Sequence, residues 1–279
     1  MSKSGRDGED RDVITSRQNP LVKRAREVRD GRDRDSIFVE GLRLCEEAAR
    51  AGLSIESALF TKSLSDVERG SHLLRELRDA GARLHAVAEG VFESIADTKS
   101  PQGVLLLARR PRADLEEFER QLAATSATAP LVVVLHGVGN PSNAGAMLRV
   151  AEAAGTQAVV STRHTVDLFS PKSLRGSMGS AFRLPLWAGA ELADVLAWCA
   201  ARGIKTVSTS AGAGVPHTEF DWTQPSAVVV GAEGGGLAPT EVGATDASIK
   251  IPMRAPVESL NVATALAVVL YEAARQRGF

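Results

Sequence analysis

Short apolar segments alternate with stretches of helical periodicity along the first half of this chain. The apolar segments 37–39, 57–60, 84–88 and 103–108 have the length and the composition of β-strands. Amphipathic stretches at 41–51 and 67–80 lie between them, and a glycine follows each, as is common just after a helix ends. The pattern predicts a small α/β unit.

Beyond Pro130 the apolar segments are uninterrupted, as in strands that are covered on both faces. The expected strands are 131–135, 158–160, 205–207, 227–230 and 249–251. The expected helices are 144–154, 192–201 and 260–275. This alternation predicts a mainly parallel sheet, in which ligands bind at the carboxyl ends of the strands.

These patterns divide the chain into four predicted segments. Residues 1–12 are Gly, Ser and charged residues, and we expect them to be a disordered tail. A first domain at 13–112 precedes a linker at 113–130, which is acidic and then rich in Ala, Thr and Ser. A second domain at 131–279 completes the chain.

The composition excludes several protein classes. The net charge of −1 does not by itself indicate a nucleic-acid partner, and 4% aromatic residues argue against a base-stacking binder of single strands. The two cysteines and five histidines show no ligand spacing, so we expect buried reduced thiols and no metal. No apolar run is long enough for a membrane span, which favours a soluble cytoplasmic protein.

The loop at 136–145 follows an expected strand and leads into a helix that carries Arg149. A glycine-bearing turn in this position suggests a phosphate or dinucleotide cradle. The Rossmann spacing fails, however, because Ser142 stands where the third glycine is required. Helix capping by Asn143 and a surface arginine would be a sufficient explanation of this loop taken alone.

Two further loops have unusual compositions. Residues 231–237 contain four glycines around Glu233, directly after an apolar strand, and allow the backbone to approach a ligand closely. Residues 251–263 contain two prolines, and either Ser259 or Asn261 could cap the last helix.

Together the three loops resemble the ordered motifs of the SpoU (TrmH) family of RNA ribose 2′-O-methyltransferases, in the SPOUT superfamily. The first is Asn143-x-Gly145-x-x-x-Arg149, and the second is Gly231-x-Glu233-x-x-Gly236-Leu237. The third comprises 251–253 and 259–262. Ala232 and Ala255 depart from the residues that are common in the family, Asn and Gly. Stretch 170–185 also resembles the family. Stretch 15–23 resembles it more weakly and is similar to its L30e-like substrate domain.

The resemblance implies an α/β protein with a trefoil knot in its C-terminal SPOUT domain, an L30e-like N-terminal domain, and a homodimer that uses the C-terminal helix. It implies S-adenosylmethionine as the cofactor. The catalytic residues it implies are Arg149, Asn143, Glu233, Ser259 and Asn261. The cofactor-binding residues it implies are Thr209, Gly231, Gly236, Ile251, Met253 and Leu260. Arg149 aids deprotonation in this family, and we expect it to act together with the substrate phosphate because a free guanidinium is a poor base.

Two basic clusters are candidates for RNA contacts. Seven basic and three acidic residues lie between Arg17 and Arg34, and a second cluster surrounds Lys172 and Arg175. The candidate RNA-binding residues are Lys23, Arg24, Arg26, Lys172, Arg175 and Ser177. The N-terminal domain favours rRNA over tRNA as the substrate.

Three alternatives stay open on the sequence alone. One is a tRNA 2′-O-methyltransferase, and another is a non-catalytic RNA-binding factor in ribosome assembly. The third, a nucleotide-dependent oxidoreductase, is disfavoured by the broken glycine fingerprint.

Overall fold

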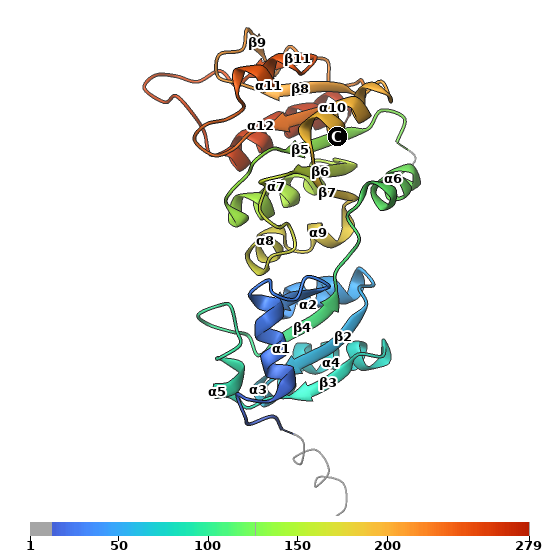
Figure 1. Cartoon of the computed structure of the whole chain (residues 1–279), viewed down its shortest axis with the longest axis vertical. Helices are drawn as coiled ribbons and strands as arrows, with labels where there is room; N and C mark the ends of the chain where they lie inside the picture. The colour runs from blue at the N-terminus through green and yellow to red at the C-terminus, as the bar shows by residue number, and fades with distance from the viewer. Residues whose placement is uncertain (1–12, 126, 279) are drawn as a thin grey trace, which may run out of the picture. The chain divides into compact units, whose positions relative to one another are not determined.

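The computed structural model describes residues 13–125 and 127–278 and divides them into two compact units (Figure 1). The first unit comprises residues up to Pro111 together with Phe169–Arg175, and the second comprises Arg112–Leu168 and Gly176 onward. The tail expected at 1–12 lies outside the described residues. None of the described helices is long and apolar enough to cross a membrane.

The first unit is built on a four-stranded mixed sheet in the order β1-β4-β2-β3. The strands are β1 (Ser36–Glu40), β2 (Ile55–Phe60), β3 (Arg83–Ala86) and β4 (Val104–Arg109). β4 is antiparallel to both neighbours, whereas β2 and β3 are parallel. The helices are α1 (Pro20–Arg29), α2 (Leu42–Arg50), α3 (Lys62–Ser65), α4 (Glu68–Asp79) and α5 (Glu89–Phe92).

Apolar residues on one face of this sheet form the core of the first unit. Phe38, Leu59 and Leu105 pack with Val22 of α1 and Phe92 of α5. Pro20 occupies the first turn of α1, and the side chain of Asn19 caps it by accepting from the Leu21 N–H at 2.8 Å.

The second unit is built on a seven-stranded sheet in which every recorded pairing is parallel, in the order β7-β6-β5-β10-β8-β11-β9. This confirms the predicted parallel sheet. The strands are β5 (Leu131–Leu135), β6 (Ala158–Thr162), β7 (Leu186–Ala190), β8 (Lys205–Thr209), β9 (Val215–Pro216), β10 (Ser226–Val230) and β11 (Ala247–Lys250). All five residues of β5, β6 and β10 are buried, which explains the apolar runs at 131–135, 158–160 and 227–230.

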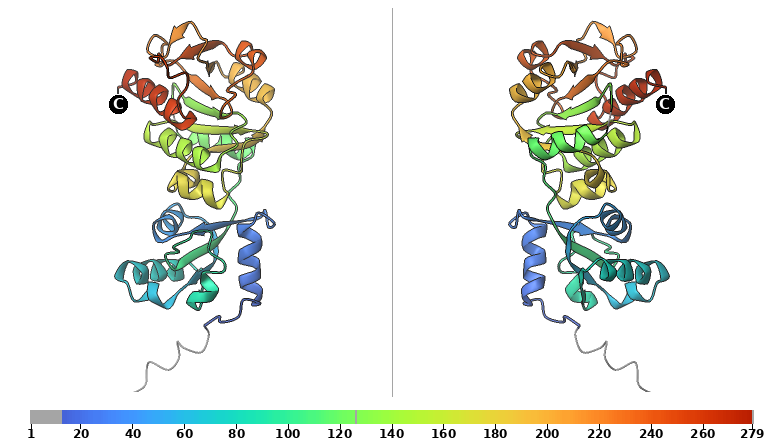
Figure 2. Two further views of the ribbon diagram at one scale, coloured as in Figure 1. Left: turned by 90° about the vertical axis from the view of Figure 1, so that its left-hand side faces the viewer. Right: turned by 90° about the vertical axis from the view of Figure 1, so that its right-hand side faces the viewer.

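Helices cover both faces of this sheet (Figure 2). The helices of the second unit are α6 (Leu115–Ala124), α7 (Pro141–Ala153), α9 (Ser180–Arg183), α10 (Leu192–Ala200), α11 (Pro239–Gly243) and α12 (Val262–Gln276). Most of α8 (Pro171–Ser177) is grouped with the first unit. On one face Phe118 of α6 and Trp198 of α10 pack against Val132 and Val229 of the strands. α7 and α12 pack against each other on the opposite face.

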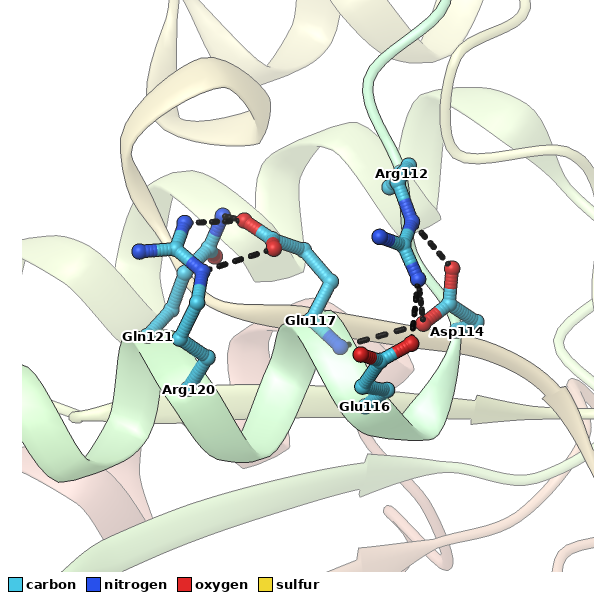
Figure 3. A network of polar contacts seen from close by, with 6 residues as sticks. All are labelled: Arg112, Asp114, Glu116, Glu117, Arg120 and Gln121. Atoms are coloured by element: carbon cyan, nitrogen blue, oxygen red, sulfur yellow. Dashed lines mark hydrogen bonds and ion pairs between the residues drawn. The ribbon is translucent and has the colours of Figure 1, made fainter.

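The segment expected to be a linker contains the ordered helix α6. Asp114 caps it by accepting from the Glu117 N–H at 3.0 Å, and Arg112 pairs with Asp114 at 2.8 Å (Figure 3). Arg120 and Gln121 both donate to the carboxylate of Glu117. Phe118 is fully buried, so this amphipathic stretch forms part of the core of the second unit.

α7 begins three residues earlier than the sequence pattern predicted. The side chain of Asn140 accepts from the Ser142 N–H at 2.8 Å, and Pro141 follows in the first turn. Proline is favoured in this position because its fixed φ suits a helix and its missing N–H would have had no partner there. Asn143 therefore lies inside the helix and does not cap it, so its side chain is available for contacts with other segments.

Candidate active site

Three polar loops lie at one edge of the parallel sheet. They follow β5, β10 and β11 and comprise residues 136–140, 231–238 and 251–260. β5, β10, β8 and β11 are successive neighbours in the sheet, so their carboxyl ends share an edge (Figure 1). The structure thus brings the first loop to segments that are 90 and 118 positions away, measured from Asn143 to Glu233 and to Asn261.

The carboxylate of Glu233 ties the second loop to the first. One oxygen accepts from the Gly139 N–H at 2.9 Å, and the other accepts from the Asn140 N–H at 3.2 Å and from Asn143 Nδ2 at 2.9 Å. Burial by itself would raise the pKa of Glu233, but the hydrogen bonds from Asn143 and Gly139 outweigh it and lower the pKa. The glutamate is therefore held as an anion.

Asn261 extends this network to the third loop. Its Oδ1 caps α12 by accepting from the N–H groups of Ala263 at 2.9 Å and Thr264 at 3.3 Å. Nδ2 of Asn261 is then directed to Oδ1 of Asn143, at 3.2 Å. Since the Asn143 amide nitrogen donates to Glu233, both amide orientations follow from the chain of hydrogen bonds. One relay of side chains joins the three predicted motifs.

Gly231 permits the tight turn of the second loop. A Cβ atom on this residue would lie 2.3 Å from the carbonyl carbon of Gly236 and 2.4 Å from its oxygen. The Gly236 N–H donates to the Ala232 carbonyl at 2.9 Å and closes the turn. The loop therefore requires glycine at 231 for a close approach of its own backbone.

The third loop offers backbone groups to a ligand. Between Met253 and Leu260, one backbone–backbone hydrogen bond is found within the described residues, from the Val257 N–H to the Arg254 carbonyl. The other backbone groups of this stretch have no backbone partner among the described residues. Ile251 directly follows β11, and Thr209 ends the adjacent β8. The predicted cofactor residues therefore lie in the loops that follow neighbouring strands of the sheet.

Two predicted catalytic residues do not join the relay. Arg149 is exposed on α7, and no hydrogen bond or ion pair joins its guanidinium to another described residue. It is six positions beyond Asn143, so the two side chains leave the helix about 120° apart. Ser259 is exposed in the third loop, also without a hydrogen bond to the described part of the chain.

Most of the expected RNA contacts near the N-terminus are engaged within the first unit. Arg24 pairs with Glu56 at 2.5 Å. Arg26 donates to Ser94 Oγ at 2.7 Å. Lys23 is exposed on α1 and points to no described partner.

The second basic cluster is also divided. Lys172 is exposed at the start of α8, whereas Arg175 pairs with Asp97 at 2.6 Å. Ser177 is fully buried.

His136 and Glu241 form a contact at the site that the sequence interpretation missed. His136 Nε2 lies 3.0 Å from Glu241 Oε1, and His136 Nδ1 lies 2.9 Å from Thr162 Oγ1. No local signal could have found this pair, because 105 positions separate its members.

Both cysteines are free and buried, as expected. Among the described residues, no group of three or more His, Cys, Asp or Glu side chains is arranged to hold a metal ion.

Comparison with known families identifies two regions of the chain. Residues 130–271 match the model of the SpoU rRNA Methylase family. Residues 19–106 match the model of the MRM3-like substrate binding domain.

Individual relatives span nearly the whole chain. The 23S rRNA (guanosine(2553)-2′-O)-methyltransferase RlmP of Bacillus subtilis is 30% identical over 264 residues, which cover 92% of this chain and 97% of RlmP. An uncharacterized tRNA/rRNA methyltransferase of Synechocystis sp. is 33% identical, over 95% of this chain and 94% of its own length.

Solved structures agree with these relatives. A crystal structure of an RNA 2′-O ribose methyltransferase is 34% identical, with a TM-score of 0.79 over 95% of this chain and 99% of that chain. The AdoMet-bound rRNA methyltransferase from Sinorhizobium meliloti is 26% identical, with a TM-score of 0.82 over 94% of this chain and 97% of its own.

Proposed function

Because the chain belongs to the SpoU rRNA methylase family, we propose that it transfers the methyl group of S-adenosylmethionine to a ribose 2′-hydroxyl of ribosomal RNA. The family is one of S-adenosylmethionine-dependent RNA ribose 2′-O-methyltransferases, and one of the similar solved structures is an RNA 2′-O ribose methyltransferase. The observation that carries the proposal is the relay of Asn261, Asn143 and Glu233, which joins all three motif loops at the carboxyl edge of the sheet.

The cofactor site that we propose uses the loops after β8, β10 and β11. Backbone at Gly231, Ile251 and Leu260 would hold the adenosine, with Thr209, Gly236 and Met253 beside it. Bound S-adenosylmethionine supplies a methyl group that is already activated on a sulfonium. The protein therefore has mainly to position the ribose hydroxyl and to accept its proton.

A substrate phosphate would accept the proton of the ribose hydroxyl, and Arg149 would bind and orient that phosphate, because an ionised guanidinium cannot itself accept a proton. The guanidinium of Arg149 is exposed and has no described partner, so it is available to a phosphate. Asn143 and Asn261 would orient the reacting ribose, and Ser259 would line the pocket. The ionised Glu233 would accept from Asn143 and hold it in place, and the proton would pass to the phosphate that Arg149 binds.

The substrate class rests on the N-terminal domain. A substrate-binding domain family matches residues 19–106, and RlmP acts on 23S rRNA. We propose large-subunit rRNA as the substrate, which implies action in the cytoplasm. Lys23 and Lys172 are the predicted contacts whose side chains are exposed and free to meet phosphates.

We also propose that the working form is a homodimer with a trefoil knot in residues 131–279, after an N-terminal domain at 13–112. Val268 and Tyr271 lie on α12 with 37% and 49% of their surface exposed. They are three positions apart and share one side of the helix, which suits a second copy of this chain.

The test is transfer of radiolabelled methyl from S-adenosylmethionine to separated rRNA and tRNA, followed by nucleoside analysis. The RNA should come from cells that lack the gene, so that the target is unmodified. A labelled 2′-O-methylnucleoside from rRNA is the expected result. Label in tRNA alone would favour the tRNA alternative, and cofactor binding without any transfer would favour an assembly factor.

A further inference from the structure

His136 occupies a junction between three strands of the second unit. It directly follows β5, and its N–H donates to the carbonyl of Val230, the last residue of β10, at 2.8 Å. On the other side its Nδ1 lies 2.9 Å from the hydroxyl of Thr162, the last residue of β6. The imidazole is thus anchored to the rigid sheet and only 22% of its side chain is exposed.

The free end of the imidazole reaches the far end of the 231–238 loop. Nε2 lies 3.0 Å from Oε1 of Glu241. The other carboxylate oxygen of Glu241 accepts from the N–H of Ala238, the last residue of the loop, at 2.7 Å. A continuous path of hydrogen bonds therefore runs from β6 through His136 and Glu241 to the end of this loop.

The contact with Glu241 sets which atom of the imidazole donates. Glu241 is an acceptor when it is ionised, so Nε2 must carry the hydrogen. His136 Nδ1 lies within hydrogen-bonding distance of the Thr162 hydroxyl, which also faces the carbonyls of Leu135 and Arg163. His136 is a directed donor to Glu241.

The same loop is held at its tip by the contacts of Glu233 with the first loop. Two clamps therefore join the loops, one at Glu233 and one at Glu241. Without the His136–Glu241 contact the 231–238 loop could shift, and Glu233 would then be displaced from its partners in the first loop. Rates fall when groups near the reacting atoms shift by about an ångström.

We infer that His136 is a positioning residue of the methyltransferase site, which fixes the 231–238 loop through Glu241 and so places Glu233 and Asn143. The inference rests on the proposed function, because it assigns His136 a task in that reaction. His136 itself need not contact the cofactor or the ribose.

The apolar packing of this region separates positioning from folding. Leu237 is 9% exposed in the core of the second unit, and Val242 of α11 packs against the same core. These contacts keep α11 packed on the sheet without His136, and the imidazole then sets the position of the Glu241 carboxylate that accepts from Ala238. Loss of the imidazole should therefore change the position of the loop more than the stability of the protein.

The test compares two replacements of His136. His136→Gln carries an amide nitrogen at about the reach of Nε2, whereas His136→Asn is too short to reach Glu241. His164→Asn is the matched control: His164 is exposed in the turn after β6 with φ +68°, a conformation that Asn tolerates. Turnover, cofactor affinity and thermal midpoint are measured for each, with rRNA from cells that lack the gene.

We expect His136→Asn to lower kcat about tenfold, the effect of a barrier raised by roughly 1.4 kcal/mol. His136→Gln should stay within about threefold of the wild type, and His164→Asn should be unchanged. In a Glu233→Gln background, His136→Asn should cost less than about twofold more, because both act on the same contact. A structural role alone would lower the thermal midpoint and would give additive losses.

Three results would overturn the inference while methyl transfer by the wild type is intact. They are full activity of His136→Asn, equal losses in the Asn and Gln variants, and additive losses with Glu233→Gln. Absence of transfer by the wild-type protein is a different result, since it refutes the proposed function itself.

Discussion

At position 233, a carboxylate meets three N–H donors, and its pKa lies below the ordinary value of 4.5. A carboxyl group whose pKa is lowered on folding stabilises the folded loop above its ordinary pKa. That contribution is lost only as the pH falls through the lowered value. Glu233 is therefore ionised throughout the neutral range and does not titrate there.

Replacement of Glu233 by Gln should lower kcat about tenfold, because hydrogen bonds to a charged acceptor contribute about 1.5–3 kcal/mol. The ratio of wild-type to variant activity should be constant between about pH 5.5 and 8.5, since the lost group does not titrate in that range. Methyl transfer measured across this range tests both statements. Glu219→Gln, on an exposed turn, is the control, and a ratio that varies with pH would contradict the assignment.

Arg149 has a different environment, because it is exposed and makes no contact that holds α7 together. We expect Arg149→Ala to lower turnover by about two orders of magnitude or more, the range of a lost proton-transfer group. Cofactor affinity should stay within about twofold, which calorimetry can measure. Arg120→Ala on α6 serves as the control. Equal losses of turnover and cofactor affinity would contradict a role in proton removal.

At the scale of elements, the 231–238 loop offers a matched pair of glycines. A Cβ at 231 would meet the Gly236 backbone at 2.3 Å, whereas a Cβ at 235 would meet nothing within 4 Å. Gly231→Ala should therefore force the loop to move, at a cost of about 1–3 kcal/mol. We expect cofactor affinity to fall at least tenfold in Gly231→Ala and to be unchanged in Gly235→Ala. Similar affinities for the two variants would place the cofactor away from this turn.

At the scale of the whole molecule, the exposed side of α12 should hold two chains together. Val268→Asp places a charge on this surface, and its burial against a second copy would be costly. We expect the wild type to sediment as a dimer and the variant as a monomer with a folded core. Val67→Asp, at a residue that is 54% exposed in the first unit, should leave the dimer intact. A wild-type monomer would exclude this interface.

The sequence by itself determined the class of fold and the location of the site loops. Fully buried strands such as β5 and β10 are recognisable because both faces require apolar side chains. The three motifs carried the family resemblance without any structure. Strand β7 was not predicted, because its sequence LWAGA has none of the β-branched residues that mark the other buried strands. Helix α1 was not predicted either, because it is rich in arginine.

Only the tertiary structure decided which polar side chains meet. Asn140, and not Asn143, caps α7, and this local choice frees Asn143 to join Asn261 and Glu233. Sequence patterns report periodicity and local capping, whereas these contacts depend on the order of strands in the sheet. For the same reason His136 had no apparent partner until β5 and β10 lay side by side and brought Glu241, 105 positions away, within 3.0 Å.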